Sequence, residues 1–471
     1  MRPVELALSL SVFVLSMIVV IGRLYTPRVR QGESWLALVV AILALIHVLS
    51  DGVRWQALPI YVAALPAMAL WLTPNFPLVQ IAMGLTCAAL ALLGIVLCHI
   101  IPVFSLPELT GPHKIGTTTL FLTDNSRTEV HDASQGGRRF VAQLWYPADD
   151  CSQLERSGYR EPATLSWRSA HLRLVRSHAC TDARPAAANG PRPIVFFSPS
   201  SGGSRGEMSY FLEDLASHGY VVVGLDHPYS SSRVAFPDGS VVRARADDWL
   251  ELSSPSALAS SLPRVEKTVA TRAADVQFAL HALEHGAVSG LAKQVAAQID
   301  FRRAAIVGYS FGGSVAVELC SRDTSFVAGI DFDGWMFRNP ALGTTFKPFL
   351  FVIEDDPLWN QSGQTSVGAG DLAREGTFAY HKTIRTSLRR WGGYLLKPAG
   401  STHRDFGDLA RAMRWPFPEA RPAPDRIQSN TRDYARAFLD RYLKGIPDRR
   451  LQVSVSGRDF EFWSRQPDAS N

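Results

Sequence analysis

The chain of 471 residues has few cysteines, and none of its five cysteines belongs to a C-x-x-C pair. Zinc and dithiol redox sites are commonly built on such pairs, so the sequence disfavours both kinds of site. Blocks of lysine and arginine are also lacking, although the net charge is +5. Because scattered arginines do not make a continuous basic surface, we predict no nucleic-acid partner. Internal repeats and low-complexity tracts are absent from the sequence as well.

Charge is scarce up to about residue 104, where the sequence contains four apolar runs, at residues 4–21, 35–49, 58–72 and 78–101. The first and last runs reach the roughly 20 residues that a membrane-spanning helix needs, and the middle two are shorter. Because short polar connectors separate the runs, we predict a transmembrane segment of four antiparallel helices over residues 1–106. A catalytic domain is then predicted over residues 107–465.

The orientation of this segment depends on a few charges. The first connector carries Arg23, Arg28 and Arg30, and loops rich in arginine favour the cytoplasm. This places both termini and the catalytic domain on the extracytoplasmic, periplasmic side of a multi-pass membrane protein. The first run lacks a small-x-small cleavage site, so we interpret it as an uncleaved anchor. Since ionisable residues occur only near the ends of the runs, the segment is predicted to be a tether and not an ion pathway.

Two cysteines in the second part of the chain, Cys151 and Cys180, bracket a loop-like insertion over residues 149–192. They could form a disulfide in an oxidising compartment, or they could remain two free thiols. The sequence leaves both alternatives open. We place the insertion near the mouth of the active site, with one short helix over residues 169–177.

The second part alternates apolar strands with amphipathic helices, which predicts a mostly parallel sheet covered by helices on both faces. The expected strands are residues 117–123, 139–146, 193–198, 220–225, 304–307, 327–332, 349–353 and 394–398. The expected helices are residues 207–218, 264–284, 313–319, 371–389, 406–413 and 431–444, and residues 232–243 are expected to form a hairpin.

The motif Gly308-Tyr309-Ser310-Phe311-Gly312 lies between the strand at 304–307 and the helix at 313–319. Strand, sharp turn and helix are the context of a G-x-S-x-G nucleophile elbow. Glycines two residues before and after the serine relieve crowding at this strained turn. The sequence therefore predicts a serine ester hydrolase of the α/β-hydrolase fold, with Ser310 as the nucleophile.

A serine nucleophile needs a base, and only His381 and His403 follow Ser310 in the sequence. His381 falls inside a helical stretch, whereas His403 follows the strand at 394–398 by a short loop. We therefore assign the base to His403. A third histidine, His227, ends another strand and is either a structural residue or a border of the pocket.

The acid cannot be chosen from spacing alone, because acidic residues end two successive strands. Asp331 and Asp333 end one strand, and Glu354, Asp355 and Asp356 end the next. In this fold the acid follows the nucleophile and lies on a loop after a later strand, which both groups satisfy.

Residues 111–408 resemble the platelet-activating factor acetylhydrolase family, the secreted and cytosolic α/β-hydrolase type. The matching motifs are G-P-H-K-I-G (111–116), F-S-P-S-S-G-G (197–203), D-L-A-S-H-G-Y (214–220), G-Y-S-F-G-G (308–313), F-D-G-W-M-F (332–337) and G-S-T-H-R-D-F (400–406). The resemblance selects Asp333 as the acid, and it implies the triad Ser310, Asp333 and His403. It also implies a metal-independent enzyme without cofactors.

An oxyanion hole should use the backbone N–H of Phe311, directly after the nucleophile. The resemblance places the second donor at Ser201, but the usual His-Gly of the family is replaced here by Pro199-Ser200. The three residues that follow the acid segment, Trp335, Met336 and Phe337, either line the acyl side of the substrate site or pack in the core.

The function that the resemblance implies is hydrolysis of short or oxidised acyl esters, including the acyl group at the second position of glycerophospholipids. The expected partners are a small ester or phospholipid substrate and the lipid bilayer. Two alternatives remain: an acyltransferase that uses the same triad with an alcohol acceptor, and a catalytically idle hydrolase fold that acts as a membrane scaffold.

Overall fold

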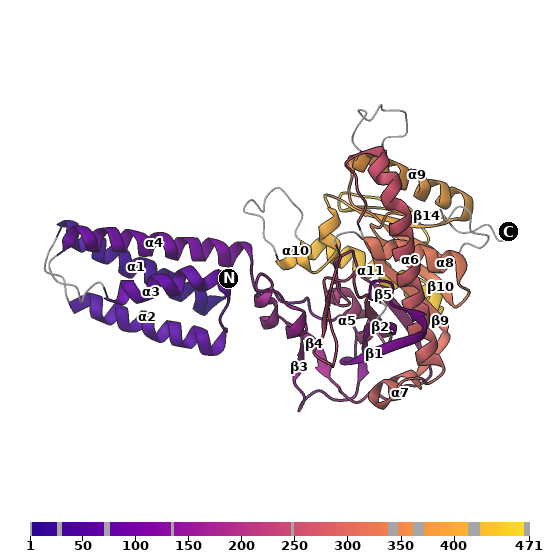
Figure 1. Ribbon diagram of the computed structural model, residues 1–471, viewed down its shortest axis with the longest axis horizontal. Helices are drawn as coiled ribbons and strands as arrows, with labels where there is room; N and C mark the ends of the chain where they lie inside the picture. Colours follow the sequence, from indigo (N-terminus) through magenta and orange to yellow (C-terminus); the bar gives the residue numbers. More distant parts are fainter. Residues whose placement is uncertain are drawn as a thin grey trace. The chain divides into compact units, whose positions relative to one another are not determined.

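The computed structural model describes residues 2–25, 31–69, 76–132, 136–245, 249–337, 347–360, 372–412 and 424–465 (Figure 1). The chain divides into two compact units. The first, here called the helical unit, comprises Met1–Ser105, Gly158–Arg176 and Arg411–Pro418, and the second, the sheet unit, comprises the remaining residues.

The helical unit contains four helices at the predicted apolar runs, α1 (Pro3–Tyr25), α2 (Gln31–Ser50), α3 (Leu58–Ala69) and α4 (Pro77–Ile100). The end of the third predicted run, residues 70–72, lies outside the described residues. The helices pack around shared apolar side chains. Two glycines of α4 permit this packing, because a Cβ on Gly84 would lie 2.6 Å from the side chain of Val20 and a Cβ on Gly94 would lie 2.4 Å from that of Ile60.

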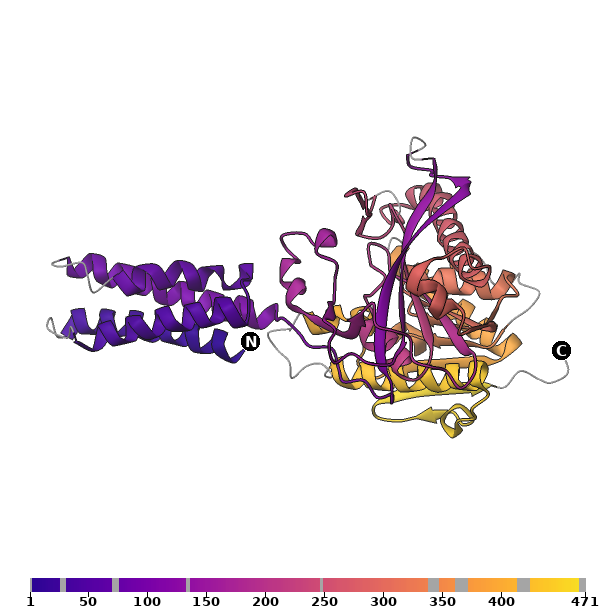
Figure 2. The ribbon, with the colours of Figure 1, turned by 90° about the horizontal axis from the view of Figure 1, so that it is seen from below.

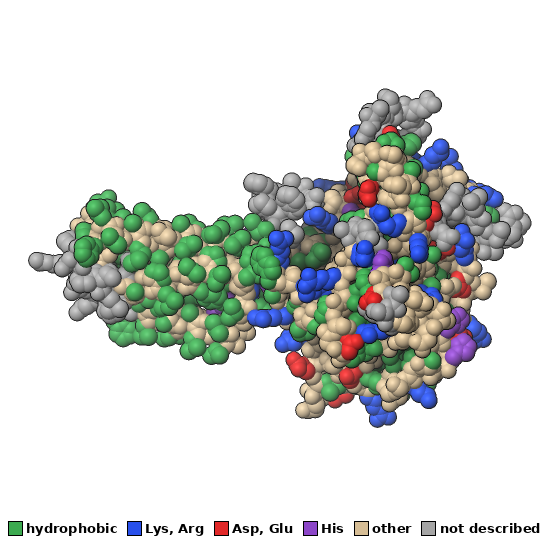
Figure 3. All heavy atoms as spheres, in the orientation of Figure 1, with side chains coloured by type: hydrophobic (Ala, Val, Ile, Leu, Met, Phe, Trp, Pro, Cys, Tyr) green, Lys and Arg blue, Asp and Glu red, His purple; other side chains and the backbone are tan. Residues whose placement is uncertain are grey.

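Two of the described helices, α1 and α4, are long and apolar enough to cross a membrane, judged by length and composition. Two further apolar helices, over Trp35–Ser50 and Trp55–Ala69, are shorter. Many apolar side chains of the unit are exposed, among them Leu65 (70%) and Leu78 (81%). Figure 3 shows apolar side chains across the visible face of these helices.

Four ionisable side chains of the helical unit form one cluster, which the sequence did not predict: Glu5, His47 and Arg54, which are buried, and Tyr61, which is partly buried. Nε2 of His47 lies 3.6 Å from the carboxylate of Glu5 and links the Arg54–Glu5 pair to the Tyr61–His47 pair. Arg54 donates two hydrogen bonds to the carboxylate of Glu5, at 2.7 and 2.6 Å, and a third to the carbonyl of Ile101 at 2.7 Å. The hydroxyl of Tyr61 lies 2.6 Å from Nδ1 of His47. The cluster therefore joins α1, α2, α3 and the end of α4, and it satisfies charges that would be costly to bury alone.

The middle of the insertion, Gly158–Arg176, also belongs to the helical unit, whereas the sequence assigned the whole insertion to the catalytic domain. Its predicted helix over residues 169–177 is a single 3-10 turn at Ala170–Leu174, followed by strand β4. Trp55 donates from its indole nitrogen to the carbonyl of Arg168 at 3.0 Å, and Arg173 donates to the carbonyl of Val53 at 3.0 Å.

The sheet unit is built on one 12-stranded sheet in the order β13-β14-β12-β11-β10-β9-β5-β6-β2-β1-β4-β3. From β6 to β12 neighbouring strands run parallel, and β2 and β14 join this part antiparallel. The strands are β1 (Lys114–Thr128), β2 (Gly137–Ala148), β3 (Arg156–Gly158), β4 (Arg176–Thr181), β5 (Arg192–Ser198), β6 (Val221–Asp226), β9 (Ile299–Tyr309), β10 (Phe326–Phe332), β11 (Phe349–Val352), β12 (Gly393–Pro398), β13 (Val455–Ser456) and β14 (Phe460–Arg465). Strands β7 (Arg233–Ala235) and β8 (Val241–Arg243) form the predicted hairpin.

Helices cover both faces of the sheet, as predicted. Helices α6 (Pro255–Glu284), α7 (Gly290–Ala296), α8 (Phe311–Arg322) and α9 (Leu372–Trp391) contribute to one apolar core with the sheet. Figure 2 shows α11 (Pro424–Lys444) on the opposite side of the sheet from α6, and α5 (Ser209–Ser217) packs beside α11. The remaining helix is α10 (Leu409–Ala412). The end of the predicted helix at 406–413 and the start of that at 371–389 lie outside the described residues.

Cys151 and Cys180 form a disulfide in the sheet unit, with their Cα atoms 5.9 Å apart. This resolves the alternative that the sequence left open. The remaining cysteines, Cys87, Cys98 and Cys320, are free and buried.

The polar cluster generates a stability prediction. Substituting Arg54 by Met leaves the buried carboxylate of Glu5 without its main partner, so the free energy of unfolding should fall by about 3–5 kcal/mol. The measurement is thermal and denaturant unfolding of the full chain in detergent. The double variant Glu5→Leu/Arg54→Met removes both charges and should regain most of the loss. Equal unfolding midpoints for the wild type and Arg54→Met would contradict the prediction.

Candidate active site

Ser310 lies at a sharp turn between β9 and α8, where its backbone has a φ of 54°. This left-handed conformation is strained for a residue with a side chain and persists only where the surroundings enforce it. A Cβ on Gly308 would lie 1.8 Å from the carbonyl oxygen of Gly312, and a Cβ on Gly312 would lie 1.9 Å from that of Ser198. The glycines of the motif thus permit the close packing that holds the serine in place.

The structure brings the three predicted triad residues into one hydrogen-bonded chain. The hydroxyl oxygen of Ser310 lies 2.9 Å from Nε2 of His403, and Nδ1 of His403 lies 2.6 Å from Oδ2 of Asp333. Because an ionised carboxylate only accepts hydrogen bonds, Nδ1 carries the proton and Nε2 accepts from the serine. Asp333 is buried, whereas the side chain of His403 is 41% exposed. A substrate can therefore approach these hydrogen-bonded residues from the side of Ser310.

His403 is positioned by groups at its backbone and ring. It begins a short 3-10 turn (His403–Phe406) after β12, and Thr402 caps this turn together with Asp405. The ring of Tyr309 stacks on the imidazole with the ring centres 5.3 Å apart, and its hydroxyl donates to the carbonyl of His403 at 2.9 Å. These contacts fix the direction in which the imidazole points.

The other four candidate acids have different partners. Asp331 is buried behind the turn and accepts from the N–H of Gly334 at 2.7 Å, and burial raises its pKa well above the usual value. The carboxylate of Asp355 lies 3.0 Å from the ammonium of Lys397. Asp356 accepts from the N–H of Leu358 at 2.8 Å. Among these candidates, Asp333 contacts the imidazole side chain.

Glu354, one of the candidate acids, contacts the backbone of His403 and not its ring, which the sequence did not predict. Its carboxylate accepts the backbone N–H of His403 at 2.8 Å. Burial, together with the charge of Asp333, raises the pKa of Glu354 to about 6. A second carboxylate therefore lies beside the triad.

The charge around His403 favours its protonated form. Burial alone would lower the pKa of His403, but the hydrogen bond and charge of Asp333 outweigh it, and Glu354 and Glu207 act in the same direction. The pKa of His403 is consequently raised above the ordinary histidine value.

The predicted oxyanion donors have N–H groups available for a ligand. Phe311 is the first residue of α8, whose first four N–H groups have no partner within the helix. Ser201 follows β5 in the loop that packs against Gly312. Within the part of the chain that the structure describes, the N–H groups of Phe311 and Ser201 donate no hydrogen bond.

Trp335, Met336 and Phe337 are partly buried and pack against the main apolar core of the sheet unit. The ring of Phe337 lies beside that of Phe311, with ring centres 5.4 Å apart. The position of Phe337 next to a predicted oxyanion donor is compatible with both a pocket wall and core packing, so the role of all three residues in substrate binding stays a prediction.

His227 is fully buried and belongs to a second Ser–His–Asp chain. Its Nε2 lies 3.2 Å from the hydroxyl of Ser198 and its Nδ1 lies 2.9 Å from Asp275, and all three side chains are buried. Burial lowers the pKa of His227 to about 4, so the imidazole is neutral. Because substrate has no access to a buried serine, this chain is structural. His381, the rejected base, is buried on α9 with its ring edge against Trp359.

The family model described as platelet-activating factor acetylhydrolase, isoform II, matches residues 100–367. The chain belongs to this family.

Relatives of the family and one solved structure agree with the assignment. A probable 1-alkyl-2-acetylglycerophosphocholine esterase of Arthroderma benhamiae is 28% identical over 65% of this chain and 76% of its own length. The platelet-activating factor acetylhydrolase of Bos taurus is 32% identical over 31% of this chain and 35% of its own. A ferulic acid esterase from Streptomyces cinnamoneus superposes with a TM-score of 0.58, at 28% identity, over 75% of this chain and 97% of that one. This member of the acetylhydrolase family is a carboxylic ester hydrolase with the α/β-hydrolase fold.

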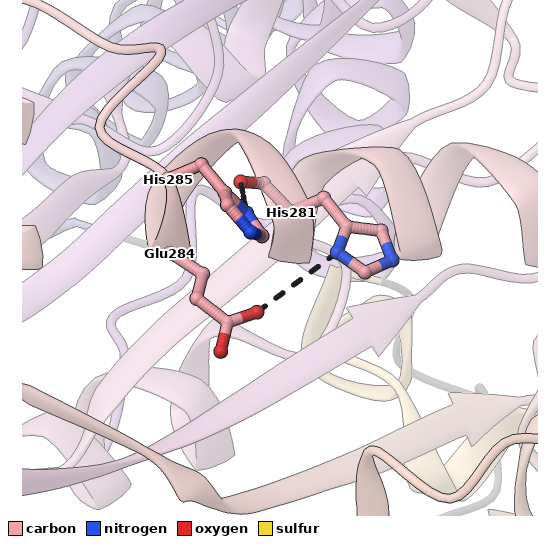
Figure 4. A group of neighbouring side chains, drawn as sticks. All are labelled: His281, Glu284 and His285. Carbon is pink, nitrogen blue, oxygen red and sulfur yellow. Dashed lines mark hydrogen bonds and ion pairs between the residues drawn. The ribbon is translucent and has the colours of Figure 1, made fainter.

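Among the described residues of this acetylhydrolase family member, one group of side chains could hold a metal ion. His281, Glu284 and His285 lie at the C-terminal end of α6, with their ligand atoms within 4.8 Å of one another (Figure 4). All three are exposed, and Nδ1 of His285 lies 3.0 Å from the carbonyl of His281. Their spacing of three and four residues on a helix was visible in the sequence. The prediction that catalysis needs no metal stays a prediction.

The second carboxylate generates a prediction about pH. The base must be neutral to accept the serine proton, so kcat/KM should rise with pH through the raised pKa of His403. Glu354→Gln keeps an acceptor for the backbone N–H but removes a charge that favours the protonated imidazole. The acidic limb of the profile should therefore move to lower pH by roughly half a unit to one unit. The measurement is kcat/KM against pH for a soluble short-chain ester.

Asp355→Asn is the matched control for Glu354→Gln. It removes a neighbouring carboxylate that is paired with Lys397, so the limb should stay in place. A profile that is the same in wild type and Glu354→Gln would contradict the role given to Glu354.

Proposed function

We propose that the chain hydrolyses short or oxidised acyl esters through an acyl-enzyme on Ser310, with glycerophospholipids acylated at the second position as the natural class of substrate. The observation that carries this proposal is the hydrogen-bonded chain from Ser310 through His403 to Asp333. It supplies a nucleophile, a base and an orienting acid in the arrangement that acyl transfer requires.

The first half of the reaction forms the acyl-enzyme. The hydroxyl oxygen of Ser310 attacks the ester carbonyl carbon while Nε2 of His403 takes its proton. The carbonyl oxygen becomes an oxyanion, which accepts hydrogen bonds from the N–H groups of Phe311 and Ser201. When the intermediate collapses, the imidazolium returns the proton to the leaving alcohol. Asp333 stays ionised throughout and stabilises the imidazolium.

The second half hydrolyses this intermediate. Nε2 of His403 takes a proton from water, whose oxygen attacks the acyl carbon, and the same oxyanion donors stabilise the second tetrahedral intermediate. Its collapse gives the carboxylic acid and restores the hydroxyl of Ser310. An alcohol in place of water would give acyl transfer, so the ratio of the two products distinguishes hydrolase from acyltransferase.

The substrate class is supported by the relatives, whose names include 1-alkyl-2-acetylglycerophosphocholine esterase and platelet-activating factor acetylhydrolase. Phe337, whose ring lies beside that of the oxyanion donor Phe311, and the neighbouring Trp335 and Met336 would contact the acyl group. A wall of this kind suits an acyl chain better than a charged acyl substituent.

The helical unit supports a location at a membrane. Helices α1 and α4, of 23 and 24 residues, are long enough for about 30 Å of hydrocarbon, and α2 and α3 complete a four-helix transmembrane bundle in this proposal. Trp55 and the exposed Trp167 lie near Arg168 and Arg173, a composition typical of the boundary between hydrocarbon and water. The Cys151–Cys180 disulfide supports an extracytoplasmic, periplasmic sheet unit, because such bonds persist in oxidising compartments.

The nucleophile assignment predicts that Ser310→Ala abolishes covalent labelling by a fluorophosphonate and lowers kcat about a million-fold on p-nitrophenyl butyrate. Ser198→Ala is the matched control, since Ser198 belongs to the buried Ser–His–Asp chain, and it should label like the wild type. Labelling of Ser310→Ala at the wild-type rate would reject the acyl-enzyme. Absence of turnover by the wild type on acetyl, butyryl and oxidised phospholipid esters would favour an idle scaffold.

The location predicts that the chain stays in the membrane fraction after an alkaline carbonate wash. Protease added to the outside of spheroplasts should cleave the sheet unit, because the proposed topology places it outside. Release by carbonate would contradict the membrane anchor, and cleavage only after lysis would reverse the topology.

A further inference from the structure

The loop that carries the predicted second oxyanion donor is held by two buried charged side chains. Glu207 accepts a hydrogen bond from the backbone N–H of Ser200, and its other carboxylate oxygen accepts from the hydroxyl of Ser200 at 2.8 Å. On the other side, Arg272 of α6 donates to the carbonyl of Pro199 at 2.6 Å and to that of Ser200 at 3.4 Å. The polar groups of two successive peptide units are therefore fixed by charged partners.

Arg272 is completely buried, with 0% of its surface exposed, and it contacts more than this loop. Its Nε donates to the hydroxyl of Ser230 at 2.9 Å, in the loop after β6. Its guanidinium carbon lies 4.6 Å from the centre of the Phe311 ring, a cation–π contact. Phe311 is the residue whose N–H is the other predicted donor. One side chain thus contacts both elements of the oxyanion hole.

The geometry of the peptide bond determines the direction in which the N–H of Ser201 points. In a trans peptide the C=O and the following N–H lie on opposite sides, and the described residues contain no cis peptide bond. The carbonyl of Ser200 accepts from Arg272 and, at 3.0 Å, from the backbone N–H of Gly203, so the N–H of Ser201 in the same peptide unit points away from both donors. That N–H has no acceptor among the described residues, so it remains available for a ligand.

We propose that Arg272 is a positioning residue of the oxyanion hole: it holds the carbonyl of the Ser200–Ser201 peptide, while Glu207 holds the N–H of the preceding Pro199–Ser200 peptide, so that the N–H of Ser201 meets the substrate oxyanion on Ser310. The inference rests on the proposed function, since it needs a tetrahedral intermediate at Ser310. The inference also gives a role to Ser200, which departs from the His-Gly pattern of the family. Its hydroxyl donates to Glu207, and this hydrogen bond helps to hold the loop. Catalysis benefits because donors that are already oriented need no reorganisation when the charge develops.

The test separates binding of the oxyanion from binding of the substrate. Arg272→Lys keeps a buried positive charge but cannot hold two carbonyls and Ser230 at once. We expect kcat to fall about 10²–10³-fold, the effect of losing one oxyanion donor, with KM nearly unchanged. A trifluoromethyl ketone, which forms an oxyanion on the nucleophile, should lose affinity by a similar factor, whereas a non-hydrolysable ether analogue of the substrate should not.

Arg192→Lys is the matched control. Arg192 is also a buried arginine that donates to backbone carbonyls, those of Ala186 and Ala187, but it begins β5, at the end of the strand opposite to the loop. The Arg192→Lys variant should leave kcat unchanged, and its affinities for the trifluoromethyl ketone and for the ether analogue should equal those of the wild type. If Arg272→Lys does not fold, Glu207→Gln, measured on the alkaline plateau where His403 is neutral in either protein, should lower ketone affinity selectively.

Selective loss of the ketone in either variant supports the proposal. Equal loss of ketone and ether analogue, or loss of neither, overturns it. These outcomes differ from a failure of the proposed function, which would be reported by fluorophosphonate labelling of Ser310→Ala. If Ser310 is the nucleophile and the ratio of ketone to ether affinity does not change, only the role of Arg272 is wrong.

Discussion

The backbone at Ser310 is the constraint on which the site depends. A left-handed conformation at a serine is unfavourable in isolation, and here packing enforces it: Gly308 lies against Gly312, and Gly312 lies against the carbonyl of Ser198. The N–H of Ser310 donates to the carbonyl of Phe332 at 2.8 Å, at the end of the strand that Asp333 directly follows. The turn therefore places the nucleophile, the strand that precedes the acid and the oxyanion loop in contact with one another.

Two pairs of charged side chains surround this turn. Asp333 and Glu354 act on His403 from its ring and from its backbone, and both favour the imidazolium that forms during the reaction. Glu207 and Arg272 act on the backbone of the opposite loop. Asp333, Glu207 and Arg272 are buried, and Glu354 is partly buried. Fixed charges at these positions orient the reacting groups before charge develops in the reaction.

Much of this site could be predicted from the sequence, because the motif around Ser310 is local and the chain order of serine, acid and base is a property of the fold. The choice between Asp333 and Glu354 could not be made from spacing, because adjacent parallel strands end at the same edge of the sheet. Arg272 was missed although a signal was present: it lies among the apolar positions of the helix at 264–284. A lone arginine on an apolar face indicates a buried polar partner, but only the fold identifies that partner.

The fold was predictable where hydrophobic periodicity is strong and was missed where it is weak. The central strands were found, although β1 and β9 run longer than their apolar cores because pairing continues beyond them. The edge strand β13 and its neighbour β14 were not predicted, even though Phe460 and Phe462 are separated by the polar Glu461. The sequence did not assign Gly158–Arg176 to the helical unit, because membership of a unit depends on contacts over a long sequence separation, such as that between Trp55 and Arg168.

The disulfide gives the insertion an unusual connectivity. Cys151 and Cys180 belong to the sheet unit, whereas Gly158–Arg176 between them belongs to the helical unit, so the chain leaves one unit and returns to it through a closed ring. A proteolytic nick within Gly158–Arg176 would leave both fragments attached to the sheet unit through the sulfur bridge. The Gly158–Arg176 loop, closed at its base by the disulfide, therefore connects the two units, as does the peptide after Ser105. Removal of the N-terminal helices would leave this loop without the residues on which it packs, such as Trp55.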